Sequence, residues 1–163
     1  MAMSTSIFET AHDLVRRSKE AGLTIATAES CTGGLIAAAL TAVPGASSVL
    51  ECGFVTYSNE SKTQMLGVPG ELIAKNGAVS AEVAAAMAAG ALARSRADIA
   101  VAVTGIAGPD GGSDAKPVGL VHLAGARRGG ALLHEEKRFG DIGRNEVRTE
   151  AAAAALALIE RLI

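Results

Sequence analysis

Aromatic residues are almost absent from this chain: they make up 2% of its 163 residues, whereas hydrophobic residues make up 49%. The core must therefore be aliphatic and rich in alanine, with helices packed close to a sheet. A nucleic-acid-binding surface usually combines basic charge with stacking aromatic side chains, but this chain has a net charge of -2. We therefore expect no nucleic acid among its partners.

Cysteine, histidine and long apolar runs are also scarce. Two cysteines do not make a disulfide framework, and three histidines without HxxxH or HxH spacing give little support for a metal site. No stretch approaches the about 18 strongly apolar residues that span a membrane, and the first residues lack the layout of a signal peptide. These absences predict a cytoplasmic protein with no membrane span, no metal and no cofactor.

The hydrophobic periodicity predicts an alternation of helices and strands. The first helix is expected to begin after a cap at residues 4–6 and to end at Gly22, and the last to run from about Gly143 to Leu162 with Asp141 as its cap. Strands are expected at 24–27, 50–56, 98–103, 118–126 and 131–139, with further helices at 33–42, 58–66, 71–75 and 80–94.

This order of elements predicts an α/β fold. Three strands joined by helical crossovers should be parallel, whereas the last two are separated by only four residues, 127–130, and should be antiparallel. We therefore expect a three-layer α/β/α sandwich with a mixed five-stranded sheet and helices on both faces. No internal repeat or linker divides the chain, so residues 1–163 are expected to form a single domain.

The segment from Thr24 to Gly34, TIATAESCTGG, carries the main chemical signal. A buried strand is followed by a hydroxyl, a thiol and two glycines, and then by an apolar helical run. At such a junction the free N–H groups of the first helical turn suit a phosphate or an oxyanion. The alternative is that Ser30 or Thr32 only caps the helix and that the glycines only allow close packing.

Polar or glycine-rich segments follow all three strands that are expected to be parallel: residues 29–34, 57–62 and 104–112. The carboxyl ends of parallel neighbours share one rim of a sheet, and α/β folds bind ligands at that rim. The three segments are therefore expected to meet in one cleft.

Ser30, Lys62 and Tyr57 are the candidate catalytic residues of this cleft, because they are the parts of a Ser-Lys type of hydrolase. A lysine desolvated in a pocket can have its pKa lowered enough to take the serine proton. Tyr57, the single tyrosine, could relay a proton or orient the lysine. The alternatives are a solvated surface lysine and a simple strand-end aromatic residue.

Cys31 is a rival nucleophile, because a thiol at a helix N-terminus has a lowered pKa. No histidine or second cysteine lies nearby in the sequence to assist it. The chemistry therefore favours Ser30.

Four separated segments resemble the CinA C-terminal domain family: 28–34 (AESCTGG), 57–62 (YSNESK), 77–80 (GAVS) and 104–109 (TGIAGP). The resemblance covers about Ile7 to Leu162. It implies a three-layer sandwich and an assembly of two or more copies. Members of the family include nicotinamide-nucleotide amidohydrolases, and this chain is similar to the stand-alone form.

The resemblance also implies roles for residues at matching positions. The family's nucleophile falls on Ser30 and its lysine base on Lys62, with Tyr57 beside them. Arg144 matches a basic position implicated in substrate binding. Without the resemblance, Arg144 would be taken as a surface arginine. The expected substrate-binding set is Glu29, Cys31, Thr32, Gly33, Gly34, Asn59, Thr104, Gly105, Ile106, Ala107, Gly108 and Arg144.

The implied activity is hydrolysis of the carboxamide of nicotinamide mononucleotide, giving nicotinate mononucleotide and ammonia in pyridine nucleotide salvage. The expected partner is thus a small nucleotide. Two other classes stay open at this point: a non-catalytic nucleotide-binding or competence-related module, and an enzyme that uses the Cys31 thiol.

Overall fold

A computed structural model of the chain describes residues 2–163, with side chains from residue 7 onward. Its centre is one five-stranded sheet with the order β2-β1-β3-β4-β5. The strands are β1 (Ile25–Glu29), β2 (Leu50–Val55), β3 (Ile99–Gly105), β4 (Leu120–Arg127) and β5 (Leu132–Arg138).

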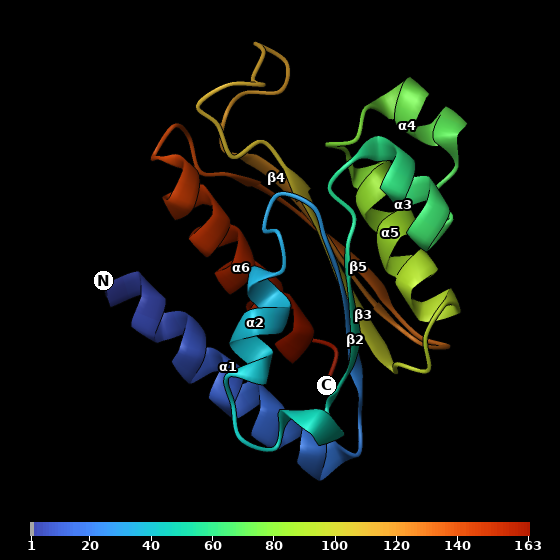
Figure 1. Cartoon of the computed structure of the whole chain (residues 1–163), viewed down its shortest axis with the longest axis vertical. Helices are drawn as coiled ribbons and strands as arrows, with labels where there is room; N and C mark the ends of the chain where they lie inside the picture. Colours follow the sequence, from blue (N-terminus) through green and yellow to red (C-terminus); the bar gives the residue numbers. More distant parts are fainter. Residues whose placement is uncertain (1) are drawn as a thin grey trace.

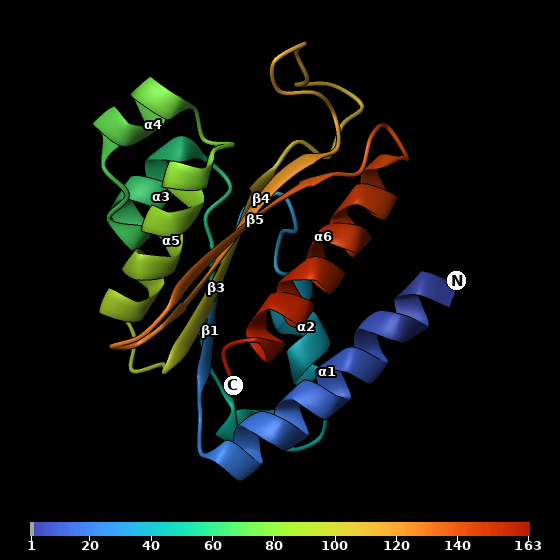
Figure 2. The ribbon, with the colours of Figure 1, turned by 180° about the vertical axis from the view of Figure 1, so that it is seen from behind.

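Helices cover both faces of the sheet (Figures 1 and 2). One layer holds α1 (Ala2–Ala21), α2 (Leu35–Thr41) and α6 (Arg144–Glu160). The other holds α3 (Asn59–Leu66), α4 (Gly70–Asn76) and α5 (Ala81–Ala93), and a short 3-10 helix, η1 (Ala46–Ser48), leads into β2. The predicted three-layer α/β/α sandwich is confirmed.

The strand pairing follows from the connections. Strand β1 pairs in parallel with β2 on one side and with β3 on the other, whereas β4 runs antiparallel to both β3 and β5. Residues of β1 are buried throughout, because the strand is central and covered on both faces. The predicted mixture of parallel and antiparallel strands is confirmed, and the carboxyl ends of β1, β2 and β3 share one rim.

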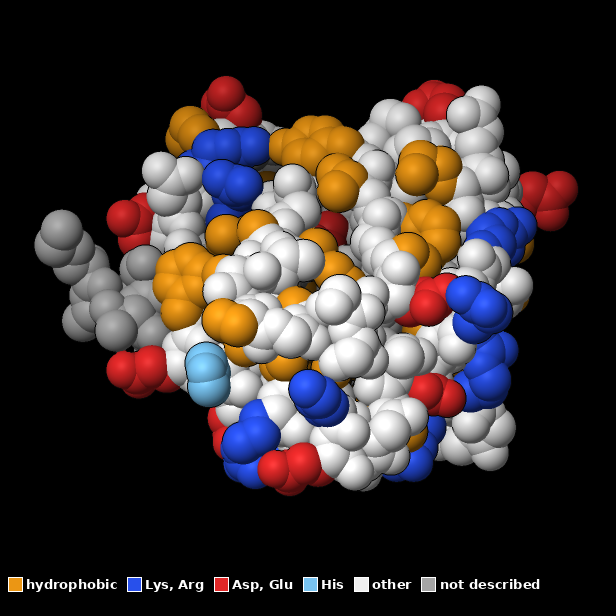
Figure 3. All heavy atoms as spheres, turned by 60° about the horizontal axis from the view of Figure 1, so that its bottom comes forward, with side chains coloured by type: hydrophobic (Ala, Val, Ile, Leu, Met, Phe, Trp, Pro, Cys, Tyr) orange, Lys and Arg blue, Asp and Glu red, His pale blue; other side chains and the backbone are white. Residues whose placement is uncertain are grey.

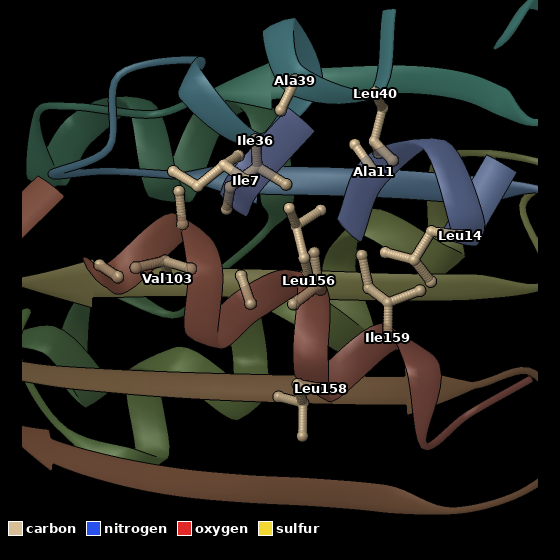
Figure 4. Close-up of a cluster of buried hydrophobic side chains, with 14 of the residues drawn as sticks. Ile7, Ala11, Leu14, Ile36, Ala39, Leu40, Val103, Leu156, Leu158 and Ile159 are labelled. Atoms are coloured by element: carbon tan, nitrogen blue, oxygen red, sulfur yellow. The ribbon is translucent and has the colours of Figure 1, made fainter. Parts of the chain in front are cut away.

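Two apolar cores hold the layers together. Figure 4 shows the first, in which Ile7 and Leu14 of α1, Ile36 of α2 and Leu156 of α6 pack over the sheet. The second lies on the other face and is built largely from the alanines of α5 and the sheet. Small side chains let these helices approach closely: at Gly90 of α5 a Cβ would overlap the backbone carbonyl of α3's last residue.

The ends of several elements differ from the prediction. Strand β1 continues to Glu29 instead of ending at residue 27, because the parallel ladders on both sides extend that far. Asp141 does not cap the last helix: Gly143 holds the cap position and no side chain binds there. Ser58 and Ser80 cap α3 and α5 with their side chains, and the cap expected at residues 4–6 lies outside the described side chains.

Figure 3 shows acidic and basic side chains interspersed around an irregular band of hydrophobic ones on one face of the molecule. Over residues 2–163, no helix combines the length and the apolar character that crossing a bilayer requires. Assembly of several copies and a cytoplasmic location stay predictions.

Candidate active site

A cavity of about 260 Å³ lies at the rim where β1, β2 and β3 end. This volume is close to the lower end of small-molecule sites, which run from about 300 to 1,000 Å³. The wall residues come from five separate parts of the sequence: Ser30, Cys31, Tyr57, Asn59, Lys62, Ala78, Val79, Thr104, Gly105, Ile106, Ala107, Gly108, Asp110, Gly111 and Arg144. The three segments predicted to share the rim therefore all contribute to one cavity.

Ser30 and Lys62 contact each other at this wall. Ser30 follows the last residue of β1, and its backbone N–H donates to the carbonyl of Val103 at 3.0 Å. Its Oγ lies 3.1 Å from Nζ of Lys62. The lysine comes from α3 and is 1% exposed, while the serine is 8% exposed. The structure thus brings the two residues together, and their catalytic roles stay a prediction.

The amine of Lys62 has three hydrogen-bond partners. Besides Ser30, Nζ donates to the backbone carbonyls of Thr56 at 2.9 Å and Tyr57 at 3.2 Å. No ion pair within 4 Å in the described part of the chain includes this lysine. Burial lowers the pKa of Lys62, and the smaller influence of Cys31 acts in the opposite direction.

This geometry satisfies the amine in both protonation states. A neutral amine has two N–H donors and one lone pair, whereas an ammonium has three donors and no acceptor. In the neutral form the two carbonyls take both N–H groups, so the lone pair of Lys62 is left to accept the O–H of Ser30. The arrangement can therefore remove a proton from the serine hydroxyl without leaving a polar group unpaired.

Two glycines in the left-handed region make the turn between Ser30 and α2. Gly33 has a φ of 60° and Gly34 a φ of 103°, and the N–H of Gly33 donates back to the carbonyl of Ser30 at 3.0 Å. Gly34 occupies the cap position of α2, and no side chain caps the helix there. The alternative in which Ser30 or Thr32 caps this helix is therefore wrong.

Glu29 caps the helix from further back in the chain. Its carboxylate accepts the N–H groups of Ile36 at 2.9 Å and Ala37 at 3.2 Å, and the residue is 1% exposed. We expected Glu29 to bind substrate and the first helical N–H groups to be free. Instead the carboxylate occupies two of these groups and lies outside the cavity wall, as do three other predicted substrate contacts: Thr32, Gly33 and Gly34.

Arg148 was missed in the sequence. It lies one turn after Arg144 on α6, and it donates Nε to the carbonyl of Cys31 at 3.2 Å and Nη2 to that of Thr32 at 3.3 Å. The spacing of four residues from Arg144, which places both arginines on one side of a helix, is the signal that could have found it.

Arg144 connects two other segments of the cavity wall, the loop after β3 and the segment after β2. Its Nη1 donates to the carbonyl of Gly108 at 2.7 Å, and its Nη2 donates to the hydroxyl of Tyr57 at 2.8 Å. The hydroxyl of Thr104 donates to the carbonyl of Ala78 at 2.9 Å.

Four further wall residues were not predicted as site residues, although each belongs to a segment already noted: Ala78, Val79, Asp110 and Gly111.

Cys31 lines the cavity but is 5% exposed. Burial raises the pKa of this thiol to about 11, with opposing contributions from its own backbone N–H and from Arg148. The lowered pKa expected for a cysteine near a helix N-terminus is therefore wrong, because desolvation outweighs the effect of the turn. The group is a neutral thiol at neutral pH, which weakens its case as a nucleophile.

Histidines take no part in the cavity wall. His122 and His134 contact each other on β4 and β5, with Nδ1 of the first 2.9 Å from Nε2 of the second. Within the described part of the chain, no group of three or more potential metal ligands gathers in one place.

Comparisons with known proteins agree with this geometry. The family model described as CinA C-terminal domain matches residues 8–163. Nicotinamide-nucleotide amidohydrolase PncC of Escherichia coli K12 is 53% identical over 139 residues, which are 85% of this chain and 83% of that protein. A CinA-like protein of Geobacter sulfurreducens is 53% identical over 148 residues, 91% of this chain but 35% of that relative. The chain thus spans about a third of the length of such longer relatives.

A solved structure matches over nearly the whole fold. The crystal structure of competence/damage inducible protein CihA from Agrobacterium tumefaciens is 55% identical and covers 96% of this chain and 95% of its own, with a TM-score of 0.95. Sequence and fold therefore lead to the same conclusion: the chain belongs to the CinA C-terminal domain family.

Proposed function

We propose that this protein hydrolyses the carboxamide of nicotinamide mononucleotide to nicotinate mononucleotide and ammonia, with Ser30 as nucleophile and Lys62 as its base. The observation that carries the proposal is the 3.1 Å contact between Ser30 Oγ and a buried Lys62 Nζ at a cavity wall. The similarity to a protein named nicotinamide-nucleotide amidohydrolase supports the reaction class.

The first step forms a tetrahedral adduct, which becomes an ester when ammonia leaves. Neutral Lys62 accepts the proton of the Ser30 hydroxyl while Oγ bonds to the carboxamide carbon, and the carbonyl electron pair moves onto its oxygen. The backbone N–H of Cys31, the residue of the turn that lines the cavity, is the proposed donor to this oxyanion. One well-placed donor of this kind typically contributes about 3 to 4 kcal/mol to transition-state stabilisation.

The second step expels ammonia. Lys62, now an ammonium, gives its proton to the carboxamide nitrogen as the C–N bond breaks, so the base is neutral again. A water molecule then attacks the ester, Lys62 accepts one of its protons, and Ser30 leaves with that proton. Lys62 takes part in each of these proton transfers, and no step of the proposal requires a metal.

Arg144 is suited to the phosphate of the nucleotide. Arg144 lines the cavity, and its guanidinium donates to the hydroxyl of Tyr57 and the carbonyl of Gly108. Guanidinium groups bind phosphate oxygens in charge-assisted pairs. The backbone of the loop from Thr104 to Gly108 is the second proposed phosphate contact. A small nucleotide with its amide at Ser30 and its phosphate near Arg144 would span the cavity.

Ammonia release from nicotinamide mononucleotide tests the proposal. The purified chain should release one ammonia for each nicotinate mononucleotide formed, and Ser30→Ala should abolish the release while keeping the thermal unfolding midpoint. Ser48→Ala is the matched control, because that exposed serine lies in η1, outside the cavity wall. Retained turnover in Ser30→Ala would refute the nucleophile, and an inactive wild-type protein would refute the activity.

Cys31→Ser separates the thiol alternative. Because the thiol is neutral, we expect this variant to keep at least half of the wild-type rate. Loss of activity in Cys31→Ser with activity retained in Ser30→Ala would instead assign the reaction to the thiol.

A non-catalytic nucleotide-binding module is the second candidate. It is favoured by the match to longer CinA-like relatives, of which this chain covers about a third. Saturable binding of nicotinamide mononucleotide by calorimetry, with no ammonia formed, would support the module over the enzyme.

A further inference from the structure

Two charged side chains hold the turn that presents Ser30, although neither lines the cavity. Glu29 binds the N–H groups of Ile36 and Ala37, and Arg148 binds the carbonyls of two consecutive turn residues. Glu29, at the end of β1, therefore binds N–H groups of the helix that follows the turn. Arg148, on α6, binds carbonyl groups of the turn itself.

The glutamate is an unusual cap. Its side chain is 1% exposed, and no ion pair within 4 Å among the described residues includes it. A buried carboxylate is costly unless hydrogen bonds and nearby positive charge compensate. Here the compensation comes from two N–H groups in the first turn of α2, where the helix dipole favours an anion.

The position of this cap links the nucleophile to the helix. Glu29 directly precedes Ser30, while Ile36 and Ala37 lie seven and eight residues after the glutamate. The two hydrogen bonds therefore close a loop that contains Ser30 and the glycine turn. A serine or aspartate at the position before the helix would satisfy similar N–H groups but would not fix the residue beside the nucleophile.

The arginine orients the peptide planes of the turn. In a trans peptide the carbonyl and the following N–H point in opposite directions. With the carbonyls of Cys31 and Thr32 drawn toward Arg148 on α6, the N–H groups of Thr32 and Gly33 must point away from α6. The N–H of Gly33 is indeed used on the inner side of the turn, where it donates to Ser30.

We propose that Glu29 and Arg148 are positioning residues that fix the Ser30 hydroxyl and the neighbouring N–H groups for attack on the amide; this inference rests on the proposed function. They act through the turn and do not touch the substrate. A misplacement of about 1 Å in a reacting group can cost about 100-fold in rate. Loss of either residue should therefore lower kcat and leave KM nearly unchanged.

The kinetic test uses the full chain and four variants. We expect Glu29→Gln and Arg148→Met to lower kcat for nicotinamide mononucleotide at least 10-fold, with KM within about 3-fold of wild type. Arg161→Met is the control, because this arginine follows the last residue of α6, far along the helix from Arg148, and pairs with Glu135. It should keep the wild-type kcat.

Arg148→Lys distinguishes positioning from charge. A lysine keeps the positive charge but lacks the planar fork that reaches two carbonyls. It should therefore stay at least 5-fold below wild type in kcat. Full rescue by lysine, wild-type kcat in Arg148→Met, or a raised KM with unchanged kcat would each overturn the role assigned to Arg148.

Hydrogen exchange tests the glutamate independently of turnover. In Glu29→Gln the amides of Ile36 and Ala37 should exchange at least 10-fold faster than in wild type, while those of α5 stay unchanged. Unchanged protection would overturn the cap whether or not the protein is active. If Glu29→Gln does not fold, Glu29→Asp, which shortens the reach of the carboxylate, should show the same local loss; protection equal to wild type would refute it. If the wild-type protein forms no ammonia but Glu29→Gln still exchanges these amides faster than wild type does, the proposed function is refuted. The cap formed by Glu29 would be supported all the same.

Discussion

Ser30 and Lys62 contact each other although they belong to opposite layers of the sandwich. The serine leads into α2, which packs with α1 and α6, whereas the lysine lies on α3, which packs with α5. Their 3.1 Å contact forms over the carboxyl rim of the sheet, where the chain leaves β1 and β2 toward different faces. Parallel neighbours with crossovers on opposite faces create this kind of crevice.

Replacing Lys62 by methionine should remove the base while keeping most of the side-chain volume. We expect kcat for ammonia release to fall by about 10² to 10⁴-fold, the usual contribution of general base catalysis. Lys75→Met, in an exposed lysine of α4, is the control and should keep the wild-type rate. Circular dichroism should show the same fold in both variants. A Lys62→Met protein with more than a tenth of the wild-type kcat would exclude this lysine as the base.

The pH profile should follow the lowered pKa of Lys62. The reaction needs the neutral amine, so activity should rise as pH increases through the pKa of this group. Because burial lowers that pKa from its ordinary value of 10.5, the rise should lie below pH 10.5. Measurements of kcat/KM from pH 5 to 11 would show it, since this ratio reports groups of the free enzyme. A midpoint at or above 10.5 would contradict a desolvated base.

Much of this site could be predicted from the sequence, because the signals were local. Near-continuous apolar runs marked the buried strands, and each was followed by a polar or glycine-rich segment. Once the crossovers made β1, β2 and β3 parallel, their shared rim brought Ser30, Lys62 and the loop after Thr104 together. That step needed only the topology and not the side-chain packing.

The missed features depend on packing between distant segments. Glu29 looked like part of a ligand site, but the extra length of β1 carries its carboxylate to the start of α2. The spacing of Arg148 from Arg144 indicates a shared helix face, but it does not indicate the turn more than a hundred residues away that Arg148 binds. The thiol of Cys31 has its pKa raised because tertiary contacts bury it, an effect opposite to that of its position in the sequence.

Tyr57→Phe tests whether this tyrosine relays a proton or positions Arg144. The hydroxyl accepts a hydrogen bond from Arg144 at 2.8 Å, and the side chain is 59% exposed. We therefore expect KM to rise by about 3- to 10-fold, which corresponds to about 0.6 to 1.4 kcal/mol, with kcat within about 3-fold of wild type. Steady-state kinetics with nicotinamide mononucleotide give both constants. A fall of 100-fold in kcat at constant KM would instead support the relay that the sequence suggested.

Gly105→Ala should displace part of the cavity wall, because the added Cβ would overlap neighbouring atoms. A Cβ at this position, the last residue of β3, would lie 2.7 Å from Cγ2 of Val121 and 3.0 Å from the carbonyl oxygen of Leu120. It would also lie 3.2 Å from Sγ of Cys31, so the turn that presents the nucleophile would be pushed as well. The backbone oxygen cannot rotate away as a flexible side chain could, so β3 or the loop after it must shift.

Overpacking of this kind typically costs about 1 to 3 kcal/mol, so urea unfolding of Gly105→Ala should show a loss of that size. The displaced wall should also lower kcat/KM at least 10-fold. Gly70→Ala is the matched control: no heavy atom lies within 4 Å of its added Cβ, and the residue begins α4. Alanine favours helix at such a position, so the control should be as stable as wild type or more so and equally active. Wild-type stability and activity in Gly105→Ala would mean that the loop after β3 can move without moving the serine.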